Sequence, residues 1–223
     1  MPALPRALLL PLLLGLVACA APAPAPAPPP ERWALPLAEA DARVDQWLRR
    51  ASATYARMVR EIRERPDVAE LRIVERPEVA QAAVAVREGR LEVQLNPALR
   101  GAQRVTLIAF EVANAYRAPE HQAIDRAVDQ GLITTAAEFG LAHELYEYEA
   151  LRLHRQVLTE VEERTGPLPP DMFLTTPPPP SARASRLPDL VTYLETQRRS
   201  GHTAHYERWF ARRARPEPAR QGK

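Results

Sequence analysis

A single cysteine near the start of the chain limits what the remainder can fold into. Cys19 is the only cysteine among the 223 residues, and it ends an apolar run, residues 7–17, that follows Arg6. A basic start, a short apolar stretch and a small-residue cleavage zone are the parts of a secretory signal. The run is shorter than the roughly 20 residues that span a bilayer. The folded protein is therefore expected to begin after this segment and to contain no disulfide.

The four residues that end at this cysteine indicate a lipid anchor. Leu16-Val17-Ala18-Cys19 resembles the lipobox of bacterial lipoproteins, in which the signal is cut before the cysteine that then carries acyl chains. The resemblance implies that residues 1–18 are a signal peptide and that Cys19 is the lipid attachment site. Because Ala20 is not the aspartate that commonly retains lipoproteins in the inner membrane, it also implies an outer-membrane anchor facing the periplasm of a Gram-negative cell. The alternative is a soluble secreted form, cut at Ala18-Cys19-Ala20.

Composition and proline placement describe one domain on a tether. Hydrophobic residues make up 46% of the chain and charged residues 26%, which is a globular composition. Residues 19–34 hold the lipidated cysteine and an Ala/Pro-rich tether that favours polyproline II. We expect a single mostly helical domain over residues 35–215, with a Pro-rich loop at residues 168–186 inside it. A basic tail, residues 216–223, ends the chain.

Charge and cysteine content exclude some functions. The net charge of +2 argues against nucleic acid as an obligatory partner. Nearly all of the positive charge is arginine, since the only lysine is Lys223. Once Cys19 is acylated no thiol is left, so cysteine metal sites and thiol catalysis are excluded.

Hydrophobic periodicity predicts several helices. Apolar residues at three- and four-residue steps over residues 37–65 predict one long amphipathic helix, closed by Pro66. Thr135 with Glu138 three residues later forms a capping box for a second long helix, which runs to about residue 164. Further helices are predicted over residues 104–116, 120–130, 188–199 and 203–214.

A period of two replaces the helical period in one part of the chain. Short strands are predicted at residues 71–74, 82–87 and 91–95, and the last two are joined through Glu88-Gly89-Arg90 as a hairpin. The expected fold class is therefore α+β and mostly helical, with a small antiparallel sheet or hairpin packed on long helices.

One helix segment resembles a catalytic motif. Phe110-Glu111-Val112-Ala113-Asn114 lies on the helix that follows the hairpin, the context in which zincin metallopeptidases place H-E-x-x-H. In those enzymes the two histidines hold zinc and the glutamate activates the bound water. Here Glu111 stands where the base would, but Phe110 has no lone pair and Asn114 is a poor zinc ligand. The resemblance implies a zincin-like fold without the zinc ligands, and hence no metal and no other cofactor.

The wider pattern resembles one group of uncharacterised bacterial envelope proteins. The segments that carry this resemblance are residues 109–111 with 114–115, residues 144–148, and residues 200–203 with Tyr206. The resemblance supplies an expectation about fold and names no reaction.

Five side chains form a candidate polar cluster. Glu111 and Asn114 share a helix face, as do Glu144 and Glu147, and His202 is the histidine that could join them. Such a cluster is either a vestigial site or a polar network that fixes helix packing. The alternative is that Glu144 and Glu147 are solvated and Glu111 pairs with an arginine.

The histidines do not supply a metal site by their spacing. His143 and His154 lie about 16 Å apart along one helix, which is too far for one ion. His202 and His205 could share a face but lack a third ligand. We expect His202 in a turn, with Gly201 closing one helix and Thr203 capping the next.

Three functions remain open. The leading one is a non-catalytic, membrane-anchored envelope lipoprotein whose domain binds a partner or serves structurally. The second is a metal-dependent, peptidase-like hydrolase with Glu111 as general base. The third is binding of an anionic envelope polymer through residues 198–223, which are rich in arginine. The alternative interpretation of these residues is a solvated tail without a partner. The expected partners are the membrane, through the lipid, and an envelope protein or anionic polymer, without nucleic acid.

Overall fold

The computed structural model describes residues 33–174 and 187–213. The predicted signal peptide, Cys19 and the tether up to residue 32 lie outside the described residues, as do most of the Pro-rich loop and the whole basic tail, residues 216–223.

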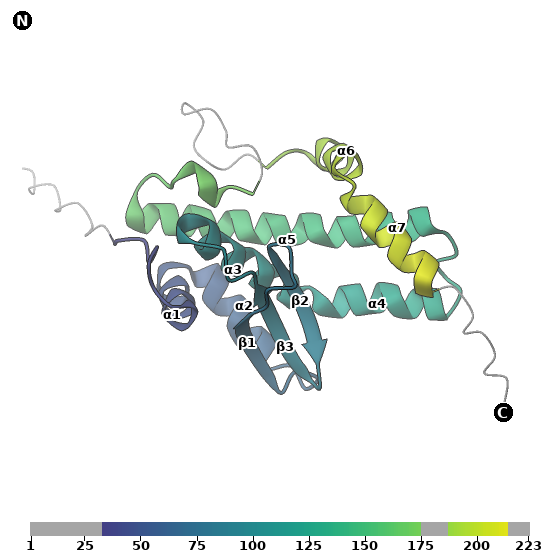
Figure 1. Ribbon diagram of the computed structural model, residues 1–223, viewed down its shortest axis with the longest axis horizontal. Coiled ribbons are helices and arrows are strands. Elements are labelled where there is room, and N and C mark those ends of the chain that lie inside the picture. Colours follow the sequence, from purple (N-terminus) through teal and green to yellow (C-terminus); the bar gives the residue numbers. More distant parts are fainter. Residues whose placement is uncertain (1–32, 175–186, 214–223) are drawn as a thin grey trace, which may run out of the picture. The chain divides into compact units, whose positions relative to one another are not determined.

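Seven α-helices and one three-stranded sheet make up the described part of the chain, which confirms a mostly helical α+β fold (Figure 1). The helices are α1 Asp41–Ala51, α2 Ala53–Arg63, α3 Gly101–Tyr116, α4 Ala118–Asp129, α5 Ala136–Thr165, α6 Leu190–Ser200 and α7 His202–Arg213. The strands are β1 Glu70–Glu75, β2 Ala82–Arg87 and β3 Arg90–Leu95, and a short 3-10 turn covers Pro170–Met172.

The sheet is mixed, in the order β1-β3-β2. β2 and β3 form the predicted antiparallel hairpin, and its two turn residues, Glu88 and Gly89, have φ of 53° and 73°. Positive φ at both positions is what a type I′ hairpin turn requires. β1 pairs with β3 in parallel, with Glu70 opposite Arg90. The prediction of an antiparallel sheet is therefore confirmed for the hairpin and wrong for β1.

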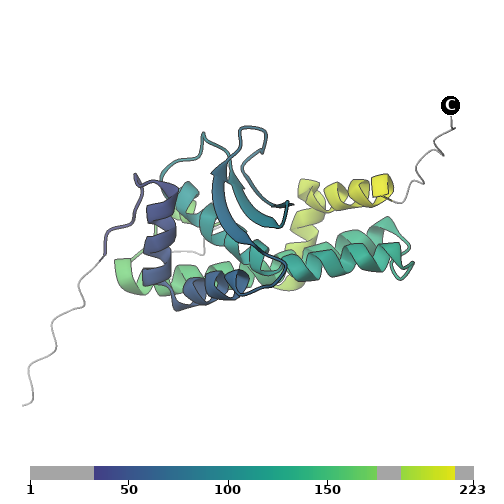
Figure 2. The same cartoon turned by 90° about the horizontal axis from the view of Figure 1, so that it is seen from below.

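Helix α3 occupies the centre of the main core. Its buried residues include Val105, Ile108 and Val112, and it contacts β2 and β3 on one side and α2 and α5 on others. Figure 2 shows the sheet standing on one side of the helices. The placement of α3 fixes where its polar residues, Glu111 and Asn114, emerge from the core.

The long helix predicted over residues 37–65 is two helices in the structure. Ser52 separates α1 from α2 and caps α2, since its hydroxyl accepts a hydrogen bond from the Tyr55 amide at 2.9 Å. Glu160 of α5 accepts hydrogen bonds from the Ser52 hydroxyl at 2.6 Å, and from the Thr54 amide and hydroxyl at 3.0 and 2.6 Å. A carboxylate is favourable at a helix N-terminus. Because Glu160 is 108 positions from Ser52, local periodicity does not reveal this break.

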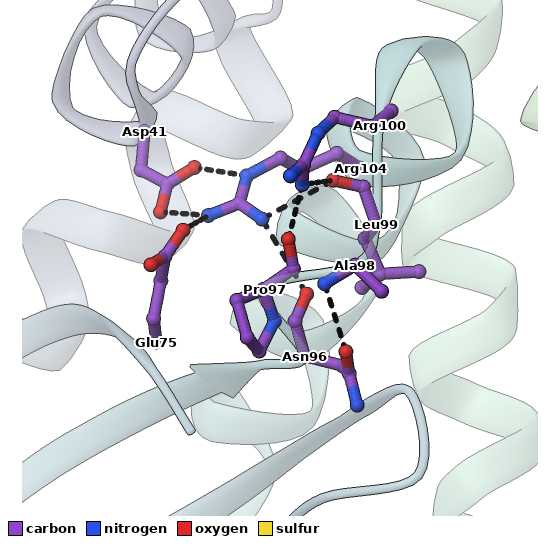
Figure 3. Close-up of polar contacts among 8 residues, drawn as sticks. All are labelled: Asp41, Glu75, Asn96, Pro97, Ala98, Leu99, Arg100 and Arg104. Carbon is purple, nitrogen blue, oxygen red and sulfur yellow. Dashed lines mark hydrogen bonds and ion pairs between the residues drawn. The ribbon is translucent and has the colours of Figure 1, made fainter. Parts of the chain in front are cut away.

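Arg104 ties α3 to α1 and β1 in what we call the Arg104 junction (Figure 3). Its guanidinium donates to both oxygens of Asp41 at 2.6 and 2.7 Å and to Glu75 at 2.9 Å. The side chain of Arg104 is only 12% exposed and that of Asp41 16%. The neighbouring Arg100 donates to the carbonyl oxygens of Pro97 and Leu99 and so holds the loop before α3. The junction orients the first turns of α1 and α3.

The variant Arg104→Leu is expected to lower the free energy of unfolding by about 2 to 3 kcal/mol, because Asp41 would keep a largely buried charge without its partner. Urea unfolding at neutral pH measures the change. Arg43→Leu is the matched control, since Arg43 pairs with Glu39 at the exposed surface and such pairs contribute less than about 1 kcal/mol. Equal losses in the two variants would contradict a special role for the junction.

Candidate functional site

Helix α7 packs closely on α5, and a glycine permits the approach. A Cβ atom added at Gly140 would meet Thr203 Cγ2 at 3.2 Å and Glu207 Cγ at 3.3 Å. Gly201 ends α6 in the left-handed conformation with φ of 81°, as predicted. The predicted cap at Thr203 is wrong. Helix α7 begins at His202, and the Thr203 hydroxyl donates to Glu144 instead.

Glu144 is the enclosed member of the polar cluster. It is 0% exposed and accepts hydrogen bonds from three side chains of α6 and α7. The donors are Tyr193 at 3.1 Å, His202 Nδ1 at 2.9 Å and Thr203 at 2.9 Å. The hydrogen bond to Glu144 raises the pKa of His202, although burial opposes the rise, and so favours the imidazolium. The expectation that Glu144 is solvated is therefore wrong. It holds α6 and α7 against α5.

The other four members of the cluster line an open cleft of about 690 Å³, which we call the central cleft. Glu111 and Asn114 reach it from α3, Glu147 from α5 and His202 from the start of α7. Strand β2 and helix α4 complete the walls. The cluster is thus divided between a closed structural anchor, Glu144, and a set of polar groups that face a space large enough for a ligand.

Glu111 is nearly buried in the cleft wall and has no cationic partner among the described residues. It is 6% exposed and accepts a hydrogen bond from Asn114 Nδ2 at 3.3 Å. Burial, together with the nearby Glu147 carboxylate, raises the pKa of Glu111 to about 8, against opposing effects of Asn114 and His202. The expected pairing with an arginine is absent from the described residues. Glu111 therefore carries a proton at neutral pH.

Glu147 is hydrogen-bonded to one side chain of α7 and also lines the central cleft. It accepts a hydrogen bond from the Tyr206 hydroxyl at 2.7 Å. Burial and the Glu147 charge both raise the pKa of Tyr206, which keeps the phenol protonated and donating. Glu147 and Glu144 lie one helical turn apart on α5 in different surroundings.

His121 is a cleft residue that the sequence does not single out. Its Nδ1 lies 2.7 Å from Nδ1 of His143, and the two rings stack with centroids 4.9 Å apart. His143 is fully buried and also stacks on Tyr206 at 4.5 Å. Burial lowers the pKa of both imidazoles, that of His143 to about 3, so one neutral ring donates to the other. The sequence contains one signal for His143: it lies four positions before Glu147, on the same face of α5, and so belongs near the predicted polar cluster.

His154 lies apart from His143 and from the cleft. Its Nε2 is 2.7 Å from the Thr106 hydroxyl, and that hydroxyl donates to the Met172 carbonyl at 2.6 Å. Since Thr106 has one proton to give, His154 donates from Nε2. Burial lowers the pKa of His154 to about 3, so it is neutral. Its role is structural, and the two histidines of α5 do not share a site.

The groups around Glu111 do not suit a zinc ion. Phe110 packs its ring edge-on against His154, with centroids 5.7 Å apart, and offers no lone pair. Asn114 directs its amide NH₂ group at Glu111. Within residues 33–174 and 187–213, no three His, Cys, Asp or Glu side chains are grouped so that they could hold a metal ion.

The C-terminal arginines are partly engaged within the fold. Arg213 pairs with Asp129 at 2.7 Å and with Asp125 at 3.7 Å. Arg198, Arg199, Arg208 and Arg212 are exposed on α6 and α7. The remaining positive charges of the predicted polyanion site, from residue 214 onward, lie outside the described residues.

Comparisons with protein-family models, curated proteins and solved structures find no match to this chain. Along the two described stretches, no helix is both long and apolar enough to cross a membrane. The lipobox and the envelope-family resemblance therefore depend on the residues quoted for them above.

The variant Glu111→Gln is expected to stabilise the protein at about pH 8 and to change little at about pH 5. The pKa of Glu111 rises from 4.5 to about 8 on folding, so wild type loses stability as the pH rises through that window. Glutamine does not ionise. One pKa unit corresponds to about 1.4 kcal/mol, so the gain at the higher pH is on the order of a few kcal/mol. Denaturant unfolding at both pH values measures it.

Glu163→Gln is the matched control, because Glu163 is exposed on α5. It is expected to follow the wild-type pH profile. If Glu111→Gln followed that profile too, the folded protein would already hold Glu111 as a carboxylate.

Proposed function

We propose that this chain is a membrane-anchored envelope lipoprotein whose domain binds a partner in the central cleft and is not itself a hydrolase. One observation carries the proposal. Glu111 and Glu147 line an open cleft, while Phe110 and Asn114 stand where a zincin has its metal ligands. The anchor is proposed from Leu16-Val17-Ala18-Cys19.

The size and lining of the central cleft support binding over a purely structural role. Ligand pockets commonly enclose about 300 to 1,000 Å³ and combine apolar walls with a few placed polar groups. The central cleft measures about 690 Å³, with apolar residues from β2 and aromatic residues from α7. A purely structural network would enclose all of its carboxylates, as the fold does with Glu144, which is 0% exposed, whereas Glu147 is only partly buried at the cleft.

The metal-dependent hydrolase is the second candidate, and the raised pKa of Glu111, about 8, favours it. A general base works best with a pKa near the operating pH. That base would still need a metal to activate the water, and Phe110 and Asn114 are unsuited to hold one. This mismatch ranks the hydrolase below the binding module.

A metal assay separates the two candidates. The full-length protein is incubated with Zn²⁺, exchanged into metal-free buffer and analysed by native mass spectrometry, and its melting temperature is measured with and without EDTA. We expect no retained zinc and no effect of the chelator, in wild type and in Glu111→Gln alike. One tightly held equivalent that Glu111→Gln loses, with turnover of a peptide or of cell wall, would overturn the proposal.

The lipid anchor has its own test. Wild type is expected in the membrane fraction, with the mass of a chain that begins at Cys19 and carries acyl groups. Cys19→Ser removes the thiol that is acylated, so this variant should leave the membrane fraction. A mature wild-type protein with the mass of an unmodified chain would contradict the anchor and leave the binding domain untouched.

A further inference from the structure

The central cleft is acidic although the whole chain is slightly basic. The chain contains 30 lysine and arginine residues and has a net charge of +2, yet neither residue type lines the cleft. Three acids do: Glu111, Asp125 and Glu147. The imidazolium of His202 is held by Glu144, and burial lowers the pKa of both His121 and His143. Arg213, which is outside the lining, pairs with Asp125. Glu111 is protonated at neutral pH, so the Glu147 carboxylate supplies the negative charge there, and Glu111 adds a second charge above about pH 8.

Two buried oxygen acceptors in the cleft lining have no hydrogen bond within the described part of the chain. Asn114 gives its amide NH₂ to Glu111, which leaves its buried Oδ1 without a partner among the described residues. The buried Oδ1 of Asp125 is likewise without a hydrogen bond there. A buried acceptor without a donor is unfavourable, because it has lost its hydrogen bonds to water without replacing them. A ligand that brings several N–H donors would remove this penalty.

Aromatic side chains complete the lining. Tyr206 and Trp209 follow each other on α7 with nearly parallel rings, 6.4 Å between centroids and 29° between planes. Both rings line the cleft with His205. Aromatic faces attract ammonium and guanidinium groups through their negative π clouds, and since His143 covers one face of Tyr206, Trp209 is the main ring for such a contact. Carboxylates, unpaired acceptors and aromatic rings all favour the same kind of ligand.

We propose that the central cleft binds a cationic group with several N–H donors, an ammonium or a guanidinium, with Glu111 and Glu147 as its charge partners. This inference rests on the proposed function, because it takes the cleft to be the binding site. The same group is presented by a basic side chain of a polypeptide and by a free small amine.

Binding is coupled to a proton. The groups that act on Glu111 are Asn114 on its own helix, Glu147 from α5 and His202 from α7. A bound cation stabilises the Glu111 carboxylate and therefore releases its proton. Raising the pH toward 8 removes that proton beforehand. Loss of the His202 charge as the pH rises acts in the same direction. Affinity for a guanidinium, which stays charged throughout, is expected to rise with pH.

Isothermal titration calorimetry with the full-length protein in detergent tests the inference. The probes are agmatine and the peptide acetyl-Ala-Arg-Ala-amide, with the citrulline peptide as a neutral match for arginine. Agmatine is expected to bind at least about tenfold more tightly at pH 8.5 than at pH 6, following Glu111. Glu147→Gln should weaken binding by about tenfold or more, and Glu111→Gln should reduce the pH dependence to the part that comes from His202. Glu163→Gln should change neither.

The outcomes separate the sources and the hypotheses. Tighter binding of the arginine peptide than of agmatine supports a polypeptide ligand, and the reverse supports a free amine. Binding of neither cation overturns the inference. Equal binding of the arginine and citrulline peptides would also overturn the inference, because the positive charge would then not matter. In that case the cleft would still be a binding site. Failure of the proposed function itself would show instead as retained zinc with turnover. Circular dichroism confirms that each glutamine variant is folded.

Discussion

The arrangement of the central cleft depends on one buried carboxylate. Glu144 is fully enclosed and accepts hydrogen bonds from Tyr193 of α6 and from His202 and Thr203 at the start of α7. A charge removed from water is strongly unfavourable unless such donors surround it. The Glu144 carboxylate therefore needs these three donors around it. Their hydrogen bonds hold the turn between α6 and α7 in one position against α5. The aromatic wall of the cleft follows from that position.

Neighbouring acids on α3 and α5 have different roles because their surroundings differ. Among the described residues, Glu144 accepts hydrogen bonds from three donors, Glu147 only from Tyr206, and Glu111 only from Asn114. The fold thus satisfies one carboxylate completely and leaves two with unused acceptor capacity at the cleft. Perturbed acids in a cleft are typical of functional sites, although structural networks contain them as well. The position of Glu111 and Glu147 in the lining of the central cleft distinguishes the two cases here.

The features that the sequence predicted correctly are those that local chemistry decides. The capping box of Thr135 and Glu138 and the left-handed Gly201 depend on residues within one turn, and both are present. The break at Ser52 was missed because it depends on Glu160, and the parallel pairing of β1 because it depends on a strand beyond the hairpin. For the site, four of the five predicted residues line the cleft. His121 was missed because its partner, His143, lies on another helix 22 positions away.

Gly140 has a consequence for engineering the protein. It does not line the cleft, yet a single methyl group at this position would already press on Thr203 at 3.2 Å. Side chains of increasing size at position 140 would act as graded wedges between α5 and α7. Each larger side chain would move Tyr206 and Trp209 of α7 further from Glu147 of α5 and so widen the central cleft. Every residue that lines the cleft would stay unchanged.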